Sequence, residues 1–333
     1  MTRWSTLLLD EAQLSEMAHV PLEDIAGHAQ LTIAARPTYR TLYRSWDKQH
    51  WSAEALNLER DAEHWQRVPR RTRSRLERIV RHFLVGEYTG LDLLAPITVG
   101  APDEASLIFL GTQSADESRH TRLMDRLASE VLGLSGDDLR YALNAAWQHS
   151  TPAQLRLNAL EARLIRPLSS LHAGHDDWLR AVAVFHIVTE GVLALTAQRR
   201  LVASLRSGSF LPGLRAGFVA MTRDESRHVA FGVEAIRRGV TENAPEARID
   251  AVADALREAL ALAVAVELPE DPSDQERAEA LAFGRELESE AVLRLRSAGF
   301  RPEAIGWIRT GMTATLASLE APEDHGGADH HVA

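Results

Sequence analysis

Cysteine is absent from the 333 residues of this chain, so no disulfide framework can form. Any metal site must therefore be built from histidine and carboxylate side chains. The chain also lacks an excess of basic residues, because its net charge is −10. That charge argues against non-specific binding to nucleic acid, which requires a basic surface.

Long hydrophobic runs are missing as well, because charged residues interrupt every apolar stretch before it reaches the length of a membrane span. The first residues, MTRWSTLLLDEAQLSE, contain too short an apolar run for a signal peptide. We therefore expect a cytoplasmic protein that binds neither nucleic acid nor a membrane. Hydrophobic residues make up 45% of the chain, which is enough to bury a sizeable core.

Runs of alternating β-branched residues are absent, whereas Ala, Leu, Arg and Glu are frequent, and this composition favours an all-α fold. We expect an extended connection that leads into a helix at 51–65. A single domain is expected over 1–319, because no Pro/Ser-rich linker divides the chain. Residues 320–333 are polar and contain glycine, and we expect a disordered tail there. The predicted helices lie within 10–48 and at about 70–95, 102–132, 152–173, 176–207, 212–240, 246–266, 274–298 and 302–317.

The pentapeptide Asp-Glu-Ser-Arg-His occurs twice, at 116–120 and at 224–228. Each copy follows a predicted helix that carries a glutamate within its apolar stripe, Glu87 in the first helix and Glu190 in the second. The chain therefore uses twice the same unit: a helix with an inward glutamate, followed by a helix with Glu-x-x-His. Such pairs can also be surface salt-bridge segments, but the apolar surroundings of the two glutamates disfavour that alternative.

The Glu-x-x-His spacing places both side chains of each pair on one helical face. Four glutamates that point into a core need a positive partner, because a buried unpaired carboxylate is costly or is forced to protonate. Two divalent ions would balance them and leave two neutral imidazoles as further ligands, a set that suits iron or manganese. The predicted metal ligands, whose glutamates are also the predicted catalytic residues, are Glu87, Glu117, His120, Glu190, Glu225 and His228.

This double pattern resembles the ferritin-like superfamily of dimetal-carboxylate proteins. The chain is similar to the small subunit of class I ribonucleotide reductase and especially to the related ligand-binding oxidases. The similar segments, within about 38–240, include Trp51-x-x-Glu-x-x-Asn-x-x-Arg-Asp61, Gly-Glu87, Glu190-Gly-Val-Leu-Ala-Leu-Thr and Asp-Glu-Ser-Arg-His-Val-Ala-Phe-Gly. The resemblance implies a ferritin-like four-helix bundle core with additional helices.

The chain differs from these relatives at the positions where the relatives have functional tyrosines. Reductase small subunits usually have a tyrosine four residues after the first ligand histidine, where this chain has Met124, and another near the C-terminus, whereas the last one here is Tyr141. The ligand-binding oxidases cross-link a tyrosine to a valine, at positions that hold Phe185 and Thr89 here. The spacing also partly matches the p-aminobenzoate N-oxygenases, but their additional histidine ligand is replaced by Met221.

Asp116 and Asp224 directly precede the two predicted ligand glutamates. A metal-bound histidine commonly donates its other N–H to a carboxylate. By resemblance, Asp224 would hold His120 and connect it to Trp51 as an electron route, and Asp116 is the second candidate for such a role. The alternative is that both aspartates pair with neighbouring arginines at the helix surface.

A substrate pocket is expected beside the metals, bordered by Thr89, Phe185, His186 and Thr189. His186 lies one turn before Glu190, so it is a candidate for a seventh ligand, a substrate contact or a hydrogen-bonded core histidine.

The predicted function is a dioxygen-activating dimetal oxidase or monooxygenase that attacks a C–H or N–H bond of a small molecule. We expect two iron ions, or one manganese and one iron, with dioxygen as co-substrate. The expected partners are the substrate, an external electron donor and a second copy of the chain in a homodimer. Two alternatives remain: a ribonucleotide reductase small subunit without the tyrosyl radical, and a non-enzymatic ferritin-like metal-binding protein.

Overall fold

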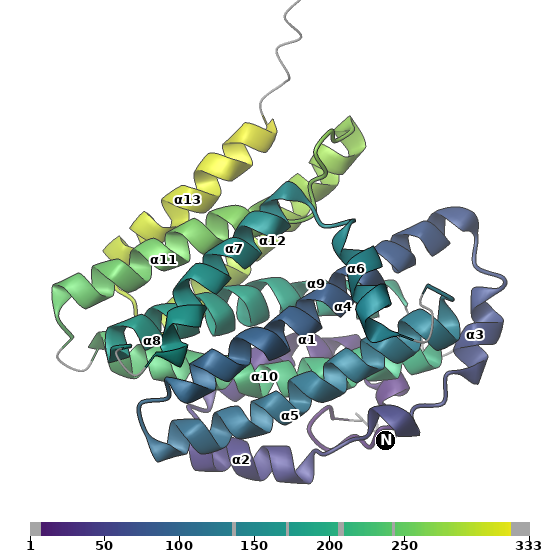
Figure 1. Ribbon diagram of the computed structural model, residues 1–333, viewed down its shortest axis with the longest axis horizontal. Helices are drawn as coiled ribbons and strands as arrows, with labels where there is room; N and C mark the ends of the chain where they lie inside the picture. Colours follow the sequence, from purple (N-terminus) through teal and green to yellow (C-terminus); the bar gives the residue numbers. More distant parts are fainter. Residues whose placement is uncertain (1–7, 135–137, 171–172, 206–209, 242–243, 321–333) are drawn as a thin grey trace, which may run out of the picture.

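The computed structural model describes residues 8–134, 138–170, 173–205, 210–241 and 244–320. Over these residues it contains helices and no strand, which confirms the predicted all-α class (Figure 1). Glu320, the first residue of the predicted tail, ends the last helix, and the rest of the predicted tail, 321–333, lies outside the described residues.

Four long helical segments form the core and carry the predicted ligands. Helix α4 packs against α5, and α10 packs against a π-helical segment, η5, which is continuous with α8 and α9. The bounds of these elements are α4 Arg70–Val99, α5 Glu104–Arg126, α8 His175–Val182, η5 Ala183–Ala194, α9 Leu195–Ser204 and α10 Pro212–Thr241.

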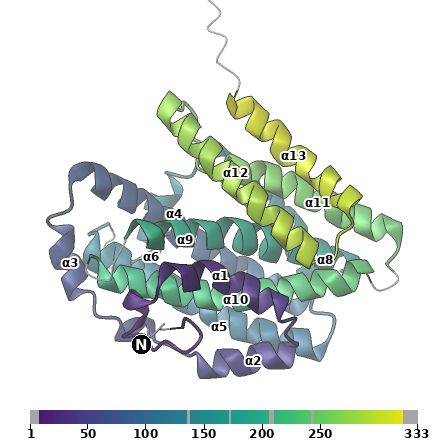
Figure 2. The ribbon, with the colours of Figure 1, turned by 180° about the vertical axis from the view of Figure 1, so that it is seen from behind.

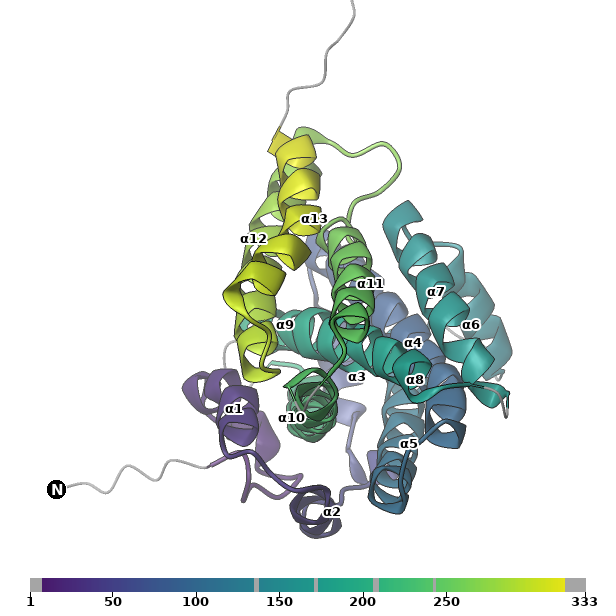
Figure 3. The same ribbon diagram turned by 90° about the vertical axis from the view of Figure 1, so that its left-hand side faces the viewer.

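The remaining helices surround this core. Helix α1 lies along α10, as the view from behind shows (Figure 2), while α11, α12 and α13 lie together at the top of Figure 3. Their bounds are α1 Leu22–Ala34, α2 Tyr39–Lys48, α3 Glu59–Trp65, α6 Leu139–Trp147, α7 Pro152–Ile165, α11 Glu246–Val264, α12 Asp274–Ser297 and α13 Pro302–Glu320. Shorter turns occur at η1 Met17–His19, η2 Ala53–Ala55, η3 Leu127–Val131 and η4 Arg166–Ser169.

Helix α10 is the central element, since every residue from Gly213 to Ile236 is buried. Burying its arginines requires hydrogen-bond partners. Arg215 donates to the carbonyl oxygens of Met17, Ala18 and Val20 in the N-terminal segment. The N-terminal segment and α10 therefore stabilise each other, and α10 holds its two predicted ligands deep inside the molecule.

Within the described residues, the helix predicted at 176–207 runs without a break from His175 to Ser204, but its middle, Ala183–Ala194, is a π-helix. Two glycines allow η5 to approach α10 closely. A Cβ on Gly191 would lie 3.0 Å from Cγ1 of Val229 on α10, and a Cβ on Gly232 would lie 2.2 Å from the Cβ of His186 on η5. π-Helical turns are rare and often occur at functional sites, and this one contains the predicted ligand Glu190.

One helix, His175–Ser204, is long and apolar enough to pass a test for a membrane span, with a mean hydropathy of 1.5. Its most apolar window is 83% buried inside the protein, so among the described residues this helix belongs to the core.

Candidate metal centre

The four core segments bring the six predicted ligands together, and all six side chains are at most 6% exposed. Their ligand atoms form two groups of four, and within each group all atoms lie within 4.8 Å of one another. Glu117 and Glu225 belong to both groups. The first group is Glu87, Glu117, His120 and Glu225, and the second is Glu117, Glu190, Glu225 and His228.

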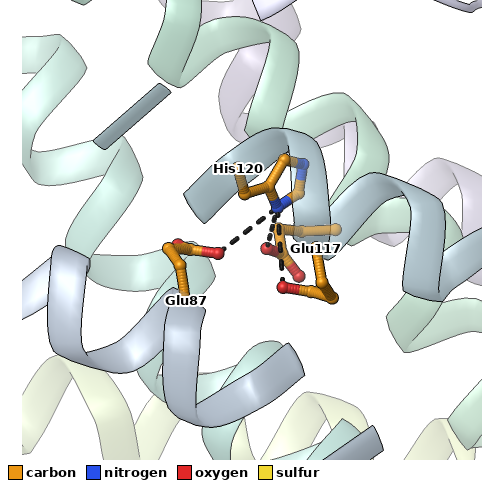
Figure 4. Close-up of side chains that lie close together, drawn as sticks. Glu87, Glu117 and His120 are labelled. Atoms are coloured by element: carbon orange, nitrogen blue, oxygen red, sulfur yellow. Dashed lines mark ion pairs between the residues drawn. The ribbon is translucent and has the colours of Figure 1, made fainter. Parts of the chain in front are cut away.

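In the first group, the carboxylates surround Nδ1 of His120. This nitrogen lies 3.3 Å from Oε2 of Glu87 and 3.7 Å from Oε2 of Glu117. It also lies 3.6 Å from Oε1 of Glu225. Figure 4 shows that Glu87, Glu117 and His120 point toward one another from α4 and α5.

The second group has the same arrangement around Nδ1 of His228. This nitrogen lies 3.3 Å from Oε1 of Glu117 and 3.4 Å from Oε2 of Glu225. Glu190, from η5, is 3.7 Å away through its Oε1. Glu117 and Glu225 thus present one oxygen to each histidine, which is the arrangement of carboxylates that bridge two ions.

The outer nitrogens of the two histidines contact the aspartates of the opposite motif. Nε2 of His120 lies 3.2 Å from Oδ2 of Asp224, and Nε2 of His228 lies 3.1 Å from Oδ2 of Asp116. A proton on Nε2 donated to the aspartate leaves Nδ1 free to bind a metal ion. The structure thus places both aspartates where they can hold the imidazoles.

Two tryptophans donate to these aspartates. Nε1 of Trp51 donates to Asp224 over 2.7 Å, and Nε1 of Trp46 donates to Asp116 over 2.9 Å. The sequence analysis identified Trp51 but missed Trp46, because nothing in the local pattern connects residues 46 and 116. The buried guanidinium of Arg227 joins both aspartates, 3.0 Å from Oδ2 of Asp116 and 2.5 Å from Oδ1 of Asp224.

Burial opposes negative charge on the glutamates of the site, and their contacts with the imidazoles oppose this effect to different degrees. Burial raises the pKa of Glu87 to about 8 and also raises the pKa of Glu190 well above its usual range. Burial opposes ionisation of Glu117 too, but close contact with the imidazoles of His120 and His228 lowers its pKa to about 2. Burial likewise opposes charging of both histidines, yet their aspartate and glutamate neighbours raise the pKa of each well above 6.5.

Several buried atoms at the centre have no hydrogen-bond partner of good geometry among the described residues. Leaving such atoms unpaired is costly, and two cations between the glutamates would satisfy them together. The residues present therefore fit a dimetal cofactor. The unpaired atoms are Oε1 of Glu117, Nδ1 of His120, Oε2 of Glu190, Oε2 of Glu225 and Nδ1 of His228.

His186 lies outside both groups of four and contacts Glu190 indirectly. Its Nε2 lies 3.0 Å from Oε1 of Gln113, whose amide donates to Oε1 of Glu190 over 2.7 Å. Burial lowers the pKa of His186 to about 3, so its imidazole is neutral. The structure therefore provides His186 with a role in holding Gln113, which in turn holds Glu190.

The other residues of the predicted pocket are placed as follows. The Phe185 ring is buried, and both it and Oε2 of Glu117 lie within 4 Å of where a Cβ on Gly90 would be. Thr189 donates to the buried Glu161, and Thr89 is half-buried on α4. The structure also shows a concavity of about 220 Å³, but it lies elsewhere, between α1, α10 and the end of α12. A pocket beside the metals stays a prediction.

Comparison with known proteins gives a family and a set of similar structures. Residues 30–268 match the family described as ribonucleotide reductase, small chain. An R2-like ligand-binding oxidase from Sulfolobus acidocaldarius is 20% identical with a TM-score of 0.63, over 80% of this chain and 94% of that chain. A variant of an R2-like ligand-binding oxidase with an aerobically reconstituted Mn/Fe cofactor is 17% identical with a TM-score of 0.58, over 84% and 92%. These similarities confirm the predicted fold.

Proposed function

Because the chain belongs to the ribonucleotide reductase small-chain family, we propose that it is a dimetal oxidase that uses dioxygen to oxidise a small organic molecule. The observation that carries the proposal is the pair of four-residue groups that share Glu117 and Glu225. Their carboxylates and imidazoles suit two iron ions, or one manganese and one iron. An external donor would supply electrons, and a homodimer is the proposed assembly.

Each residue of the site has a defined task in this proposal. Glu87 and His120 would complete the ligands of one ion, and Glu190 and His228 those of the other, with Glu117 and Glu225 between them. The bound pair would supply redox chemistry toward dioxygen, while the protein sets ligand geometry and excludes water. Burial of all six side chains provides that exclusion.

The site favours an oxidase over a radical-generating reductase subunit. Met124, fully buried, stands at the position where reductase subunits usually have their tyrosine. Tyr88, which directly follows Glu87, is 43% exposed and therefore points away from the metals. Residues 142–333 contain no tyrosine, so this segment cannot relay a radical through one. We therefore propose that the chain acts on a small-molecule substrate of its own.

Oxygen exposure of the reduced, metal-loaded protein is expected to give no long-lived tyrosyl radical, because Met124 cannot be oxidised to one. Electron paramagnetic resonance at successive times after mixing is the measurement. A strong tyrosine signal that disappears in Tyr88→Phe would contradict this expectation and favour the reductase small subunit.

Thr89→Trp is expected to lower substrate oxidation by about tenfold or more while two ions remain bound, because Thr89 borders the proposed pocket and the larger indole would occupy it. Thr89→Ser, which keeps the hydroxyl and adds no bulk, is the matched control. Oxygen consumption with a panel of amines and hydrocarbons measures turnover and separates N–H from C–H oxidation. Unchanged turnover in Thr89→Trp would contradict the proposed substrate pocket. Activity only with an added reductase large subunit would contradict the proposal that the chain acts on a substrate of its own.

A further inference from the structure

A continuous chain of contacts connects the second histidine of the metal centre with the protein surface. Nδ1 of His228 faces the glutamates, and its Nε2 lies 3.1 Å from Asp116. Asp116 accepts a hydrogen bond of 2.9 Å from the indole of Trp46, on α2. The centroid of that indole lies 5.7 Å from the ring centroid of Tyr43, whose side chain is 40% exposed.

The corresponding chain at the other histidine ends inside the molecule. Trp51, hydrogen-bonded to Asp224, is only 4% exposed. The guanidinium of Arg119 lies 5.2 Å from the centroid of its ring and donates to its carbonyl oxygen. This positive charge shields the indole from solvent and makes removal of an electron from it more costly. Arg119 also pairs with Asp116, which accepts the N–H of Trp46, but among the described residues no cation lies over the ring of Trp46 itself.

We propose that electrons reach the metal centre through Tyr43 and Trp46 on α2, and not through Trp51. The proposal rests on the dimetal function proposed above. A one-electron donor protein would be oxidised by one electron, and the ion bound to His228 would be reduced by one. No covalent bond changes, and Trp46, Asp116 and His228 end in the state in which they began.

The contacts support this route because the rate of electron transfer falls steeply with distance and is highest along an unbroken series of contacts. From Trp46 to His228, each step is a hydrogen bond between buried or half-buried groups. At the outer end, Tyr43 and Trp46 extend the aromatic contact to solvent, where a donor can reach it. Trp46 could also act by positioning alone, since its N–H holds Asp116, which in turn holds the imidazole of His228.

The first test separates electron transfer from positioning. Fully oxidised, metal-loaded protein is mixed with reduced methyl viologen, and the absorbance of the metal centre reports its reduction. Trp46→Gln keeps a side-chain N–H for Asp116 but removes the indole, and Trp51→Gln is the matched control for the other chain. Trp46→Gln is expected to slow reduction about tenfold or more with both ions retained, whereas Trp51→Gln changes it by less than about twofold. A Trp46→Gln protein reduced at the wild-type rate would overturn the proposal and leave Trp46 as a positioning residue.

The second test fixes the point of entry and uses the absence of native cysteine. Asp47→Cys and Ser52→Cys, both at exposed positions, each accept one thiol-reactive photosensitiser, next to Trp46 and Trp51 respectively. Flash-generated electrons are expected to reach the metals faster from position 47, and the advantage should vanish when Trp46→Gln is added. Equal rates of metal reduction from the labels at positions 47 and 52 would contradict electron entry through Trp46. If the protein binds no ions, the dimetal function itself is refuted. If the metal-loaded protein is reduced at the same rate with and without Trp46, only the proposed electron route is refuted.

Discussion

Glu225→Ala is expected to lower the metal content of the reconstituted protein from two ions per chain to nearly none, because Glu225 belongs to both groups of four. Removal of this carboxylate takes one ligand from each ion and half of the shared negative charge between them. Glu117→Ala should have the same effect for the same reason. Metal analysis after reconstitution, with circular dichroism to check folding, is the measurement.

A graded control follows from the geometry. Glu87 belongs to one group only, so Glu87→Ala should retain about one ion per chain. Glu104→Ala, exposed at the start of α5, should retain both. If Glu117→Ala and Glu225→Ala both keep two ions per chain, the assignment of the metal centre is wrong.

Arg227→Met is expected to lower the free energy of unfolding of the metal-free protein by about 3–5 kcal/mol, since removing one partner of a buried ion-pair network leaves part of its negative charge uncompensated. Arg227 is 3% exposed and pairs with Asp116 and Asp224, which are themselves 1% and 0% exposed. Burial opposes ionisation of Asp224, but the charge of Arg227 is the largest influence that keeps its pKa well below its usual range. Without this guanidinium, Arg119, which pairs with Asp116 and lies 3.9 Å from Oδ2 of Asp224, would be left to offset both carboxylates.

Chemical denaturation in the presence of a chelator measures this effect. The matched control is Arg163→Met, which removes an exposed pair with Glu258 and should cost less than about 1 kcal/mol. Adding Asp116→Asn to Arg227→Met should recover part of the loss, because one of the two buried carboxylate charges is removed and Arg119 is left to offset the other. A loss no larger than that of Arg163→Met would show that Arg227 does not hold the aspartates together.

Most helices could be predicted from the sequence because their breaks are marked locally. Asp103, Thr151 and Ser273 accept backbone hydrogen bonds at the starts of α5, α7 and α12, as their residue types indicate. Helix α6, Leu139–Trp147, was not predicted, since it is short and carries no part of the repeated motif. The segment predicted as 152–173 ends its α-helix earlier, at Ile165, two residues before Pro167.

The gathering of the six site residues could also be predicted, because the Glu-x-x-His spacing fixes a helical face and the surrounding residues show that this face is buried. The supporting contacts could not. The hydrogen bonds of Trp46 with Asp116 and of Gln113 with Glu190 join residues 70 and 77 positions apart. Nor does apolar periodicity distinguish a π-helix from an α-helix at Glu190. The close approach through Gly191 and Gly232 that accompanies the π-helix is a tertiary contact.

The shared glutamates also set an order of events during synthesis of the chain. Helices α4 and α5 supply three of the four residues of the first group, but the fourth, Glu225, comes from α10. Neither group is complete until the ribosome has added residue 225 of 333. A nascent chain therefore carries the carboxylates of its first half without their partners until α10 emerges, and the complete centre can be loaded with metal only after that point.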